Sequence, residues 1–243
     1  MAERLQKALA RAGLASRRQA DRWVEQGRVT VNGRTAVPGT RINPGDRIAL
    51  DGEPLDLPNL SSPTLVLAYH KPEGELSSRR DSEGRPTVFG RLPELEDCRW
   101  IQVGRLDLNS SGLLLFTNDG DLANALMHPS REVEREYRVR VRGRPDAAIL
   151  DRLRQGITLE DGPAHFDSVE ILPGKGKNAQ LRVVLGEGRK REVRRLLEAV
   201  GHPVSRLLRV RYGPVTLPRD LKPGQWRELS SDEVAELRRA VGF

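Results

Sequence analysis

Residues 104–120, GRLDLNSSGLLLFTNDG, place one carboxylate, Asp107, before a hydroxyl-rich turn and an apolar run. Asp107 follows an Arg-Leu pair, and the apolar run begins at Leu113. A short apolar run bounded by turn residues is typical of a buried strand. We therefore expect a core strand after this loop, which would hold Asp107 rigidly.

The loop contains no second acid, histidine or cysteine beside Asp107. Most loop aspartates cap a turn or a helix, and spacing alone does not exclude that role here. Hydrolysis of a glycosidic bond usually requires two carboxylates, whereas the next acid, Asp119, stands beside Gly120 and is typical of a turn. A lone acid is better suited to covalent catalysis.

From Leu65 onward, strand-like runs alternate with helix-like stretches. This pattern predicts an α+β domain over residues 65–243, with a mixed, mainly antiparallel sheet and flanking helices around a central cleft. The strand-like runs are LVLAYHK (65–71), LLLFTN (113–118), YRVRVRG (137–143) and LRVVLG (181–186), and the helix-like stretches are 121–129, 145–156 and 191–203.

The N-terminal residues predict a smaller unit. LQKALARAG has helical spacing and stops at Gly13, and the spacing Ser16 to Gln19 is that of a capping box opening a second helix. Short strands are expected around the turn Asn32-Gly33 and at residues 46–50. We assign this domain to residues 1–58 and a linker rich in Pro and Ser to residues 59–64.

Composition points to a soluble protein with a polyanionic partner. The 243 residues carry a formal net charge of +7 and a sequence pI of about 10.0, which favours nucleic acid over a membrane. No stretch approaches the roughly 18 apolar residues of a membrane span, and the polar start MAERLQK lacks the apolar segment of a secretory signal. One cysteine and four distant histidines give no metal-binding spacing, so we expect a cytoplasmic protein without a metal.

Two segments concentrate the positive charge. Residues 4–34 hold eight Lys or Arg against two acids, with Arg17, Arg18 and Arg22 crowded on one helix. Within the basic segment 187–213, residues 189–211 hold eight more Lys or Arg against two acids, Glu192 and Glu198. Helical phase puts Arg194 beside an apolar stripe, from which it could lean into a cleft and keep a carboxylate ionised. Either segment could instead be an ordinary solvated face.

Tyr137 shares the apolar face of its strand with Val139 and Val141. A core position is the usual role of such a tyrosine. The alternative is stacking, because enzymes that act on a base draw it out of its helix and hold it against an aromatic ring.

Residues 104–141 and 187–213 closely resemble the pseudouridine synthases of the RsuA and RluB group, and residues 4–34 resemble the S4 RNA-binding domain that precedes their catalytic domain. The resemblance implies conversion of uridine to pseudouridine: the N1–C1′ bond breaks, the uracil turns, and C5 joins C1′. By the same resemblance Asp107 is the catalytic nucleophile, Tyr137 stacks on the base and Arg194 pairs with the aspartate.

Further roles also follow from the resemblance. Arg105 would help hold the flipped nucleotide, and Arg191 and Arg195, together with Arg17, Arg18 and Arg22, would bind RNA. Ser110 stands where the group often has threonine; it keeps the hydroxyl, so we expect little change in activity. The implied partner is a structured stem-loop of ribosomal RNA, bound by a monomer that needs no cofactor.

YHKPEGEL (69–76) and EGRPTVFGRLP (83–93) resemble the branch that modifies 23S RNA of the large subunit. The main rival is a 16S target in the small subunit. A non-catalytic S4-type binding or ribosome-assembly factor, and a glycosylase that releases free uracil, are the alternatives outside the group.

Overall fold

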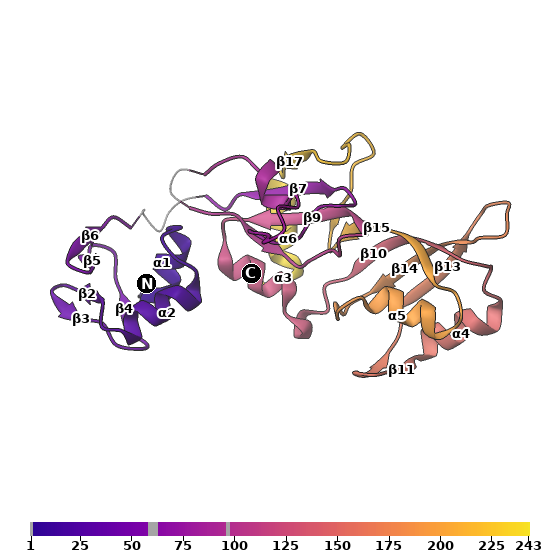
Figure 1. Ribbon diagram of the computed structural model, residues 1–243, viewed down its shortest axis with the longest axis horizontal. Helices are drawn as coiled ribbons and strands as arrows, with labels where there is room; N and C mark the ends of the chain where they lie inside the picture. The colour runs from indigo at the N-terminus through magenta and orange to yellow at the C-terminus, as the bar shows by residue number, and fades with distance from the viewer. Residues whose placement is uncertain (1, 58–62, 96–97) are drawn as a thin grey trace. The chain divides into compact units, whose positions relative to one another are not determined.

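The computed structural model of the chain describes residues 2–57, 63–95 and 98–243 (Figure 1). These residues form two compact units. The smaller unit comprises Met1–Thr64 with the segments Pro93–Ile101 and Asn118–Gly120, and the larger comprises the rest of the chain. Most of the expected linker, residues 59–62 of 59–64, lies outside the described residues.

Two short helices open the smaller unit, as the sequence predicts. α1 (Leu5–Arg11) is followed by Gly13 at φ 74°, a conformation that glycine adopts without strain. The Ser16 side chain accepts a hydrogen bond from Gln19 N and starts α2 (Arg17–Glu25). Leu5, Leu9, Ala20 and Val24 bury their side chains in one core.

A small antiparallel sheet completes this core. Asn32 and Gly33 both have positive φ, 51° and 78°, as a two-residue hairpin turn requires. The strands, in spatial order, are β3 (Arg34–Thr35), β2 (Val29–Val31), β5 (Ile48–Leu50) and β6 (Glu53–Leu55), while β1 (Glu3–Arg4) pairs with β4 (Arg41–Ile42). This confirms the two helices and short strands expected of an S4-like domain.

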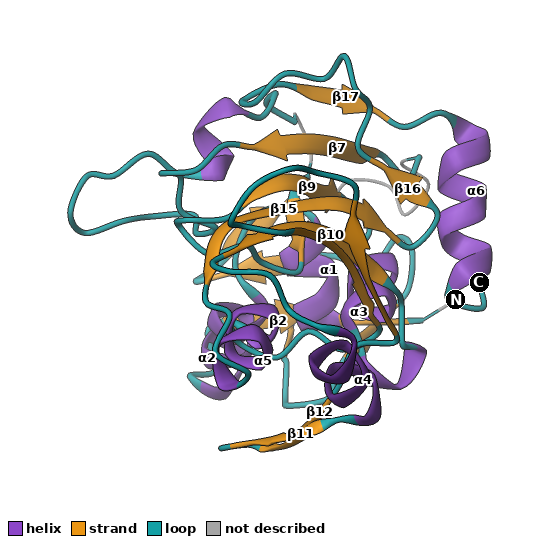
Figure 2. Ribbon diagram, turned by 90° about the vertical axis from the view of Figure 1, so that its right-hand side faces the viewer, coloured by secondary structure: helices purple, strands orange, loops and turns teal. Residues whose placement is uncertain are grey.

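The larger unit is built on one twisted, mixed sheet (Figure 2). Neighbouring main strands of this sheet are antiparallel, except β15 and β9, which are parallel. Two short strands add to this sheet: β8 (Ile101–Val103) pairs with β9, and β16 (Val215–Thr216) pairs with β15. The main strands, in spatial order, are β13 (Ser168–Leu172), β14 (Gln180–Leu185), β10 (Arg135–Val141), β15 (Val204–Tyr212), β9 (Ser111–Thr117), β7 (Val66–Lys71) and β17 (Trp226–Glu228).

The burial of two strands matches their sequence patterns. All residues of β9 are buried, as expected for the apolar run after Asp107. β10 alternates instead: Tyr137, Val139 and Val141 are buried, whereas Arg138 and Arg140 are exposed. β9 is therefore an interior strand, and β10 has one buried and one exposed face.

Helices flank this sheet, as predicted. α4 and α5 lie on the same side of the strands β13, β14 and β10 (Figure 1). The helix positions are α3 (Gly120–Met127), α4 (Ala147–Gln155), α5 (Glu192–Ala199) and α6 (Ser231–Ala240), with short 3-10 turns at Val88–Arg91 and Pro129–Arg131 and a separate hairpin of β11 (Ile157–Leu159) and β12 (Gly162–Ala164).

The helix expected within residues 191–203 is present as α5, but the whole basic segment 187–213 is not one helix. α5 ends at Ala199, Gly201 has φ 81°, and Pro203 cannot continue a helix. The chain then enters β15, the nine-residue strand that pairs with both β10 and β9. The last third of the basic segment therefore belongs to the centre of the sheet.

Candidate active site

Asp107 lies in the loop between β8 and β9, and this loop is anchored on both sides. Ser77 Oγ donates a hydrogen bond to the Leu106 carbonyl at 2.8 Å, and Gly74 N donates to the Leu108 carbonyl at 2.8 Å. Ser110 N closes a turn onto the Asp107 carbonyl at 3.0 Å. The Asp107 side chain itself is 34% exposed. The carboxylate is therefore fixed by its backbone and reachable from solvent.

The pairing of β9 with β15 brings the two parts of the site together. Gly112, with φ 110°, faces Arg209 of β15, and a Cβ atom at Gly112 would lie 2.2 Å from the Arg209 carbonyl oxygen. Only glycine allows this approach. The Asp107 loop enters β9, and α5 precedes β15, so the carboxylate and the helix arginines meet at the same end of two adjacent parallel strands.

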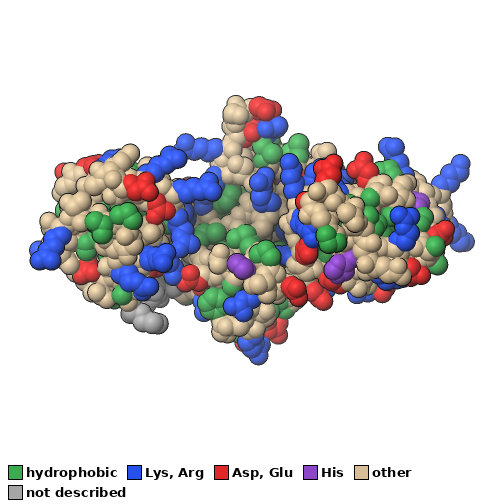
Figure 3. Space-filling model, turned by 90° about the horizontal axis from the view of Figure 1, so that it is seen from below, with side chains coloured by type: hydrophobic (Ala, Val, Ile, Leu, Met, Phe, Trp, Pro, Cys, Tyr) green, Lys and Arg blue, Asp and Glu red, His purple; other side chains and the backbone are tan. Residues whose placement is uncertain are grey.

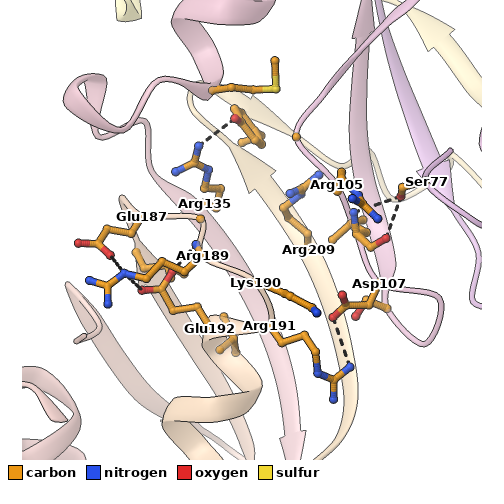
Figure 4. Close-up of a pocket in the computed structure, with 18 of the residues that line it drawn as sticks. Ser77, Arg105, Asp107, Arg135, Glu187, Arg189, Lys190, Arg191, Glu192 and Arg209 are labelled. Atoms are coloured by element: carbon orange, nitrogen blue, oxygen red, sulfur yellow. Dashed lines mark hydrogen bonds and ion pairs between the residues drawn. The ribbon is translucent and has the colours of Figure 1, made fainter. Parts of the chain in front are cut away.

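Two arginines of the α5 region approach Asp107, and Figure 4 shows one of them, Arg191, beside the carboxylate. Arg191 Nη1 lies 3.7 Å and Arg194 Nε 3.9 Å from Asp107 Oδ2. Arg191 occupies the N-cap of α5 with φ 53°, a left-handed conformation that turns its side chain back toward the loop. The sequence assigned only Arg194 to this pair and Arg191 to RNA, so the proximity of Arg191 to Asp107 is an addition.

Arg194 also holds the loop. Its Nη2 donates to the Asn109 carbonyl at 2.7 Å and to Ser110 Oγ at 3.2 Å. Burial lowers the pKa of Arg194, and the nearby Arg191 adds to this effect, whereas Asp107 opposes it. Ser110, the position that departs from the family pattern, thus uses its hydroxyl as an acceptor for Arg194.

Lys71, at the end of β7, was not predicted from the sequence as a residue of the site. It is fully buried, and its Nζ donates to the carbonyls of Pro72 at 2.9 Å and Ser110 at 2.8 Å. Burial lowers the pKa of Lys71 to about 8, although Glu75, Glu73 and Asp107 act in the opposite direction. A signal was present: strand alternation puts Lys71 on the same face as the buried Tyr69.

A cavity of about 1310 Å³ opens beside Asp107. Lys and Arg side chains are numerous on the face of the molecule that the space-filling view shows (Figure 3). Tyr137, Leu207 and Arg209 line the cavity from the sheet, and Arg105 lines it from the Asp107 loop. The volume exceeds that of a typical small-molecule site, so it can accept a nucleotide with its neighbours.

Tyr137 and Arg209 face each other across β10 and β15. Tyr137 is 9% exposed and so offers a ring edge or face to the cavity from a nearly buried position. Arg209 is 2% exposed; its Nε donates to the Leu113 carbonyl, and its Nη2 has no hydrogen-bond partner among the described residues. Arg209 was also not predicted as a site residue, because it was counted only as part of the basic segment 187–213 and not as part of a strand.

The other predicted arginines are dispersed. Arg105 is exposed, and Lys190, another residue not predicted, extends toward Asp107 (Figure 4). Arg195 turns away to a two-point ion pair with Asp161 of the β11–β12 hairpin, at 2.8 and 2.9 Å. The three arginines of the smaller unit, which form no part of this cavity, are exposed on α2: Arg17, Arg18 and Arg22.

The loop before α5 is held by a second charged cluster. Arg189 Nε donates to Glu187 at 2.6 Å, and Arg189 N donates to Glu192 at 3.0 Å. Burial raises the pKa of Glu192, and the hydrogen bond from Arg189 lowers the pKa of Glu187. Arg189 Nη2 also donates to the Pro163 carbonyl, which ties this loop to the β11–β12 hairpin.

Across the described part of the chain, no three His, Cys, Asp or Glu side chains are grouped to hold a metal ion. No described helix is long and apolar enough to span a membrane.

A carboxylate fixed among cations at the edge of a nucleotide-sized cavity is suited to covalent chemistry on an RNA base, and comparison with known proteins identifies the class. The RNA pseudouridylate synthase family matches residues 65–199, and the S4 domain matches residues 3–48. The chain belongs to the RNA pseudouridylate synthase family, and it is a pseudouridine synthase with an N-terminal S4 domain.

The relatives narrow this class. The chain is 55% identical over 99% of its length to "Ribosomal large subunit pseudouridine synthase B" of Escherichia coli (strain K12), of which it covers 84%. The protein of the same name from Pasteurella multocida is 54% identical over 99% of the chain and 71% of its own length. A solved structure described as "Crystal structure of pseudouridylate synthase" has a TM-score of 0.65 and 27% identity, covering 96% of this chain and 99% of that one. The family resemblance and the α+β fold are confirmed.

Proposed function

We propose that this enzyme converts one uridine of 23S ribosomal RNA in the large subunit to pseudouridine, with Asp107 as the nucleophile. The observation that carries the proposal is the anchored, partly exposed Asp107 carboxylate facing two arginines at the edge of the cavity. The names of relatives that are 54–56% identical support the large-subunit target.

The reaction requires a carboxylate that is ionised and oriented toward the uridine. Arg191 and Arg194 supply positive charge beside Asp107, and Arg194 and Lys71 hold the loop through its carbonyls. Asp107 can add to C6 of the base, attack C1′, or remove a proton at C2′. We favour a covalent adduct, which keeps the reacting fragment attached while the N1–C1′ bond is exchanged for C5–C1′.

Tyr137 is assigned to stacking on the displaced base. Its ring lines the cavity from a rigid central strand, so it can support a base without moving far. The walls of the cavity would also keep the freed uracil from leaving, and its exposed rim residue Arg105 would hold the flipped nucleotide.

RNA recognition is divided between the two units in this proposal. Arg17, Arg18 and Arg22 on α2 would contact RNA phosphates, as would Arg191. Arg195 is held by Asp161, so its expected RNA contact has less support than that of Arg191. We assign residues 1–58 to RNA binding and residues 65–243 to catalysis, and a second tethered contact would raise affinity.

We further propose that the enzyme acts as a monomer in the cytoplasm, where its RNA is made. Asp107, Tyr137, Arg191 and Arg194 all come from one chain, so no second copy is needed to complete the site. The isomerisation moves bonds within one nucleoside and changes no oxidation state, so we assign it no cofactor.

A non-catalytic RNA-binding role has less support, because it gives no reason for a carboxylate held between arginines at a cavity. A glycosylase would need a group to activate water, whereas the charged groups in ion-pair range of Asp107 are Arg191 and Arg194, and the cavity acids Glu187 and Glu192 accept hydrogen bonds from Arg189. The small-subunit target has no support among the relatives described above.

The test is pseudouridine mapping of ribosomal RNA by carbodiimide labelling and reverse transcription. A strain lacking the protein is complemented with wild type, Asp107→Ala, or Asp151→Asn, a change of an exposed aspartate on α4. We expect one large-subunit uridine to lose its mark and only wild type and Asp151→Asn to restore it. A mark confined to the small subunit would refute the target, and restoration by Asp107→Ala would refute the nucleophile.

A further inference from the structure

The exposed face of β10 carries arginines that the active site does not use. Tyr137 lines the cavity, and strand alternation directs Arg138 and Arg140 to the opposite face of the sheet. Both are exposed. On β15, Leu207 and Arg209 line the cavity, whereas Arg206 alternates to the outer face and has a side chain that is 74% exposed.

The strand register brings these arginines opposite one another. Arg140 is paired with Arg206 on β15, and Arg138 is paired with Arg182 on β14. Like charges directly opposite each other in a sheet are destabilising. Two such oppositions on adjacent strands therefore cost stability, and the fold alone gives no reason to keep them.

Acids compensate only one end of this face. Arg182 lies 3.2 Å from Glu136 and 3.5 Å from Glu170, and Arg211 lies 2.8 Å from Glu134. These residues form a neutralised ladder across the strands.

At the other end of this face, the positive charges of the arginines are not neutralised by acids. Within the part of the chain that the structure describes, no acid lies in ion-pair range of Arg138 or Arg140. Among the described residues, the only acid in ion-pair range of Arg206 is Glu73, at 4.0 Å. We call Arg138, Arg140 and Arg206 the outer arginine strip.

We infer that the outer arginine strip binds phosphates of the RNA substrate at a place separate from the cavity. Guanidinium groups suit phosphate because they donate paired hydrogen bonds in a planar fork. Arg138 and Arg140 are two residues apart on a strand, or about 7 Å, which is of the same order as the spacing of successive phosphates. The inference rests on the proposed function, since it assigns a second contact to the same RNA.

The gain in affinity from such a contact should depend on the length of the RNA. A short stem-loop that fills the cavity gains little from the far face of the sheet, whereas a long folded RNA can reach both. The strip should thus raise affinity for long ribosomal RNA and leave the chemical step unchanged.

The test compares the triple variant Arg138→Gln, Arg140→Gln, Arg206→Gln with a control that removes the same charge from exposed positions elsewhere: Arg152→Gln, Arg219→Gln, Arg239→Gln. The dissociation constant for a long large-subunit RNA transcript is measured as a function of KCl concentration. We expect the strip variant to lower the slope of log K against log salt by about 2 to 3, and to weaken binding roughly tenfold or more near 0.1 M salt. The control should change both much less.

Three further readouts keep the inference separate from folding and from the proposed function. The triple Arg→Lys variant at the strip should retain the slope, because it keeps the charge. The melting temperature of the strip variant should not fall below that of the control, and kcat at saturating RNA should match wild type. A slope equal to the control's, or a binding loss that accompanies unfolding, would overturn the inference. If wild type forms no pseudouridine at all, the proposed function fails, while the slopes still decide whether the strip binds RNA.

Discussion

The Nε of Arg194 lies 3.9 Å from Asp107 Oδ2 and has no hydrogen-bond partner among the described residues. This nitrogen is buried, so bulk water cannot accept a hydrogen bond from it. A movement of about 1 Å would convert the contact into a charge-assisted hydrogen bond. Arg194 is therefore placed to tighten on the carboxylate when the cavity is filled.

Replacement of Arg194 should affect turnover more than replacement of Arg191. We expect Arg194→Ala to lower kcat by about 100-fold or more, because it removes charge from Asp107 and two hydrogen bonds from the loop. Arg194→Lys should be intermediate, since one ammonium cannot make all these contacts. Arg191→Ala should cost less, because the Arg191 side chain is 47% exposed and solvent screens it. Single-turnover rates on RNA check this order, and an equal or larger loss for Arg191→Ala would contradict it.

Tyr137 should tolerate loss of its hydroxyl but not of its ring. If it stacks on the base, Tyr137→Phe keeps kcat/KM near wild type. Tyr137→Leu should lose about 1–3 kcal/mol of transition-state binding, the usual value of one stacked base. Circular dichroism melting of both variants separates this effect from loss of core packing. A Phe variant as defective as Leu would argue for a role of the hydroxyl instead.

Because Lys71 is buried, the free energy of unfolding should depend on pH in the alkaline range. Its pKa is about 8 in the fold and 10.5 in the reference state. Between these values the unfolded chain binds more protons, so the free energy of unfolding should rise with pH across this window. Lys71→Met should lack the rise, and the difference between the two curves should change by up to about 3 kcal/mol from pH 8 to 10.5. Urea titrations of both proteins at several pH values measure it; parallel curves would show that Lys71 keeps an ordinary pKa.

Gly112→Ala should disrupt the centre of the sheet. The added Cβ would meet the Arg209 backbone, at 2.2 Å from O and 2.6 Å from N, and φ there is 110°. We expect a loss of more than about 4 kcal/mol, or failure to fold, because backbone atoms on both strands must separate. Gly90→Ala is the control, since a Cβ there meets nothing within 4 Å. Near-equal melting temperatures for the two variants would show that β9 and β15 approach less closely.

Local patterns in the sequence were sufficient to predict much of the fold. Ser16, Gly13 and the Asn32-Gly33 turn act within a few residues of themselves, so the helices and hairpin of the smaller unit were predictable. The burial of β9 and the alternation of β10 followed from hydrophobic pattern for the same reason.

Features that depend on distant contacts were not predictable in this way. β15 is rich in arginine and follows a helix, and only its pairing with β9 and β10 explains why it is a strand. Lys71 meets Ser110 across 39 positions, and Arg191 reaches Asp107 only because of its left-handed backbone. The assignment of Asp107 itself came from a family resemblance, since one carboxylate in a loop has many possible uses.

The parallel pairing of β9 and β15 also sets the order in which activity can arise during synthesis. Arg194 and the Asn109 carbonyl that it holds are 85 positions apart, and β15 comes later still. A nascent chain that has emerged only as far as β14 contains Asp107, Tyr137 and Lys71, but neither the arginines nor the strand that aligns them. Because contacts of such long separation form late in folding, we expect the enzyme to stay inert until its last third is made.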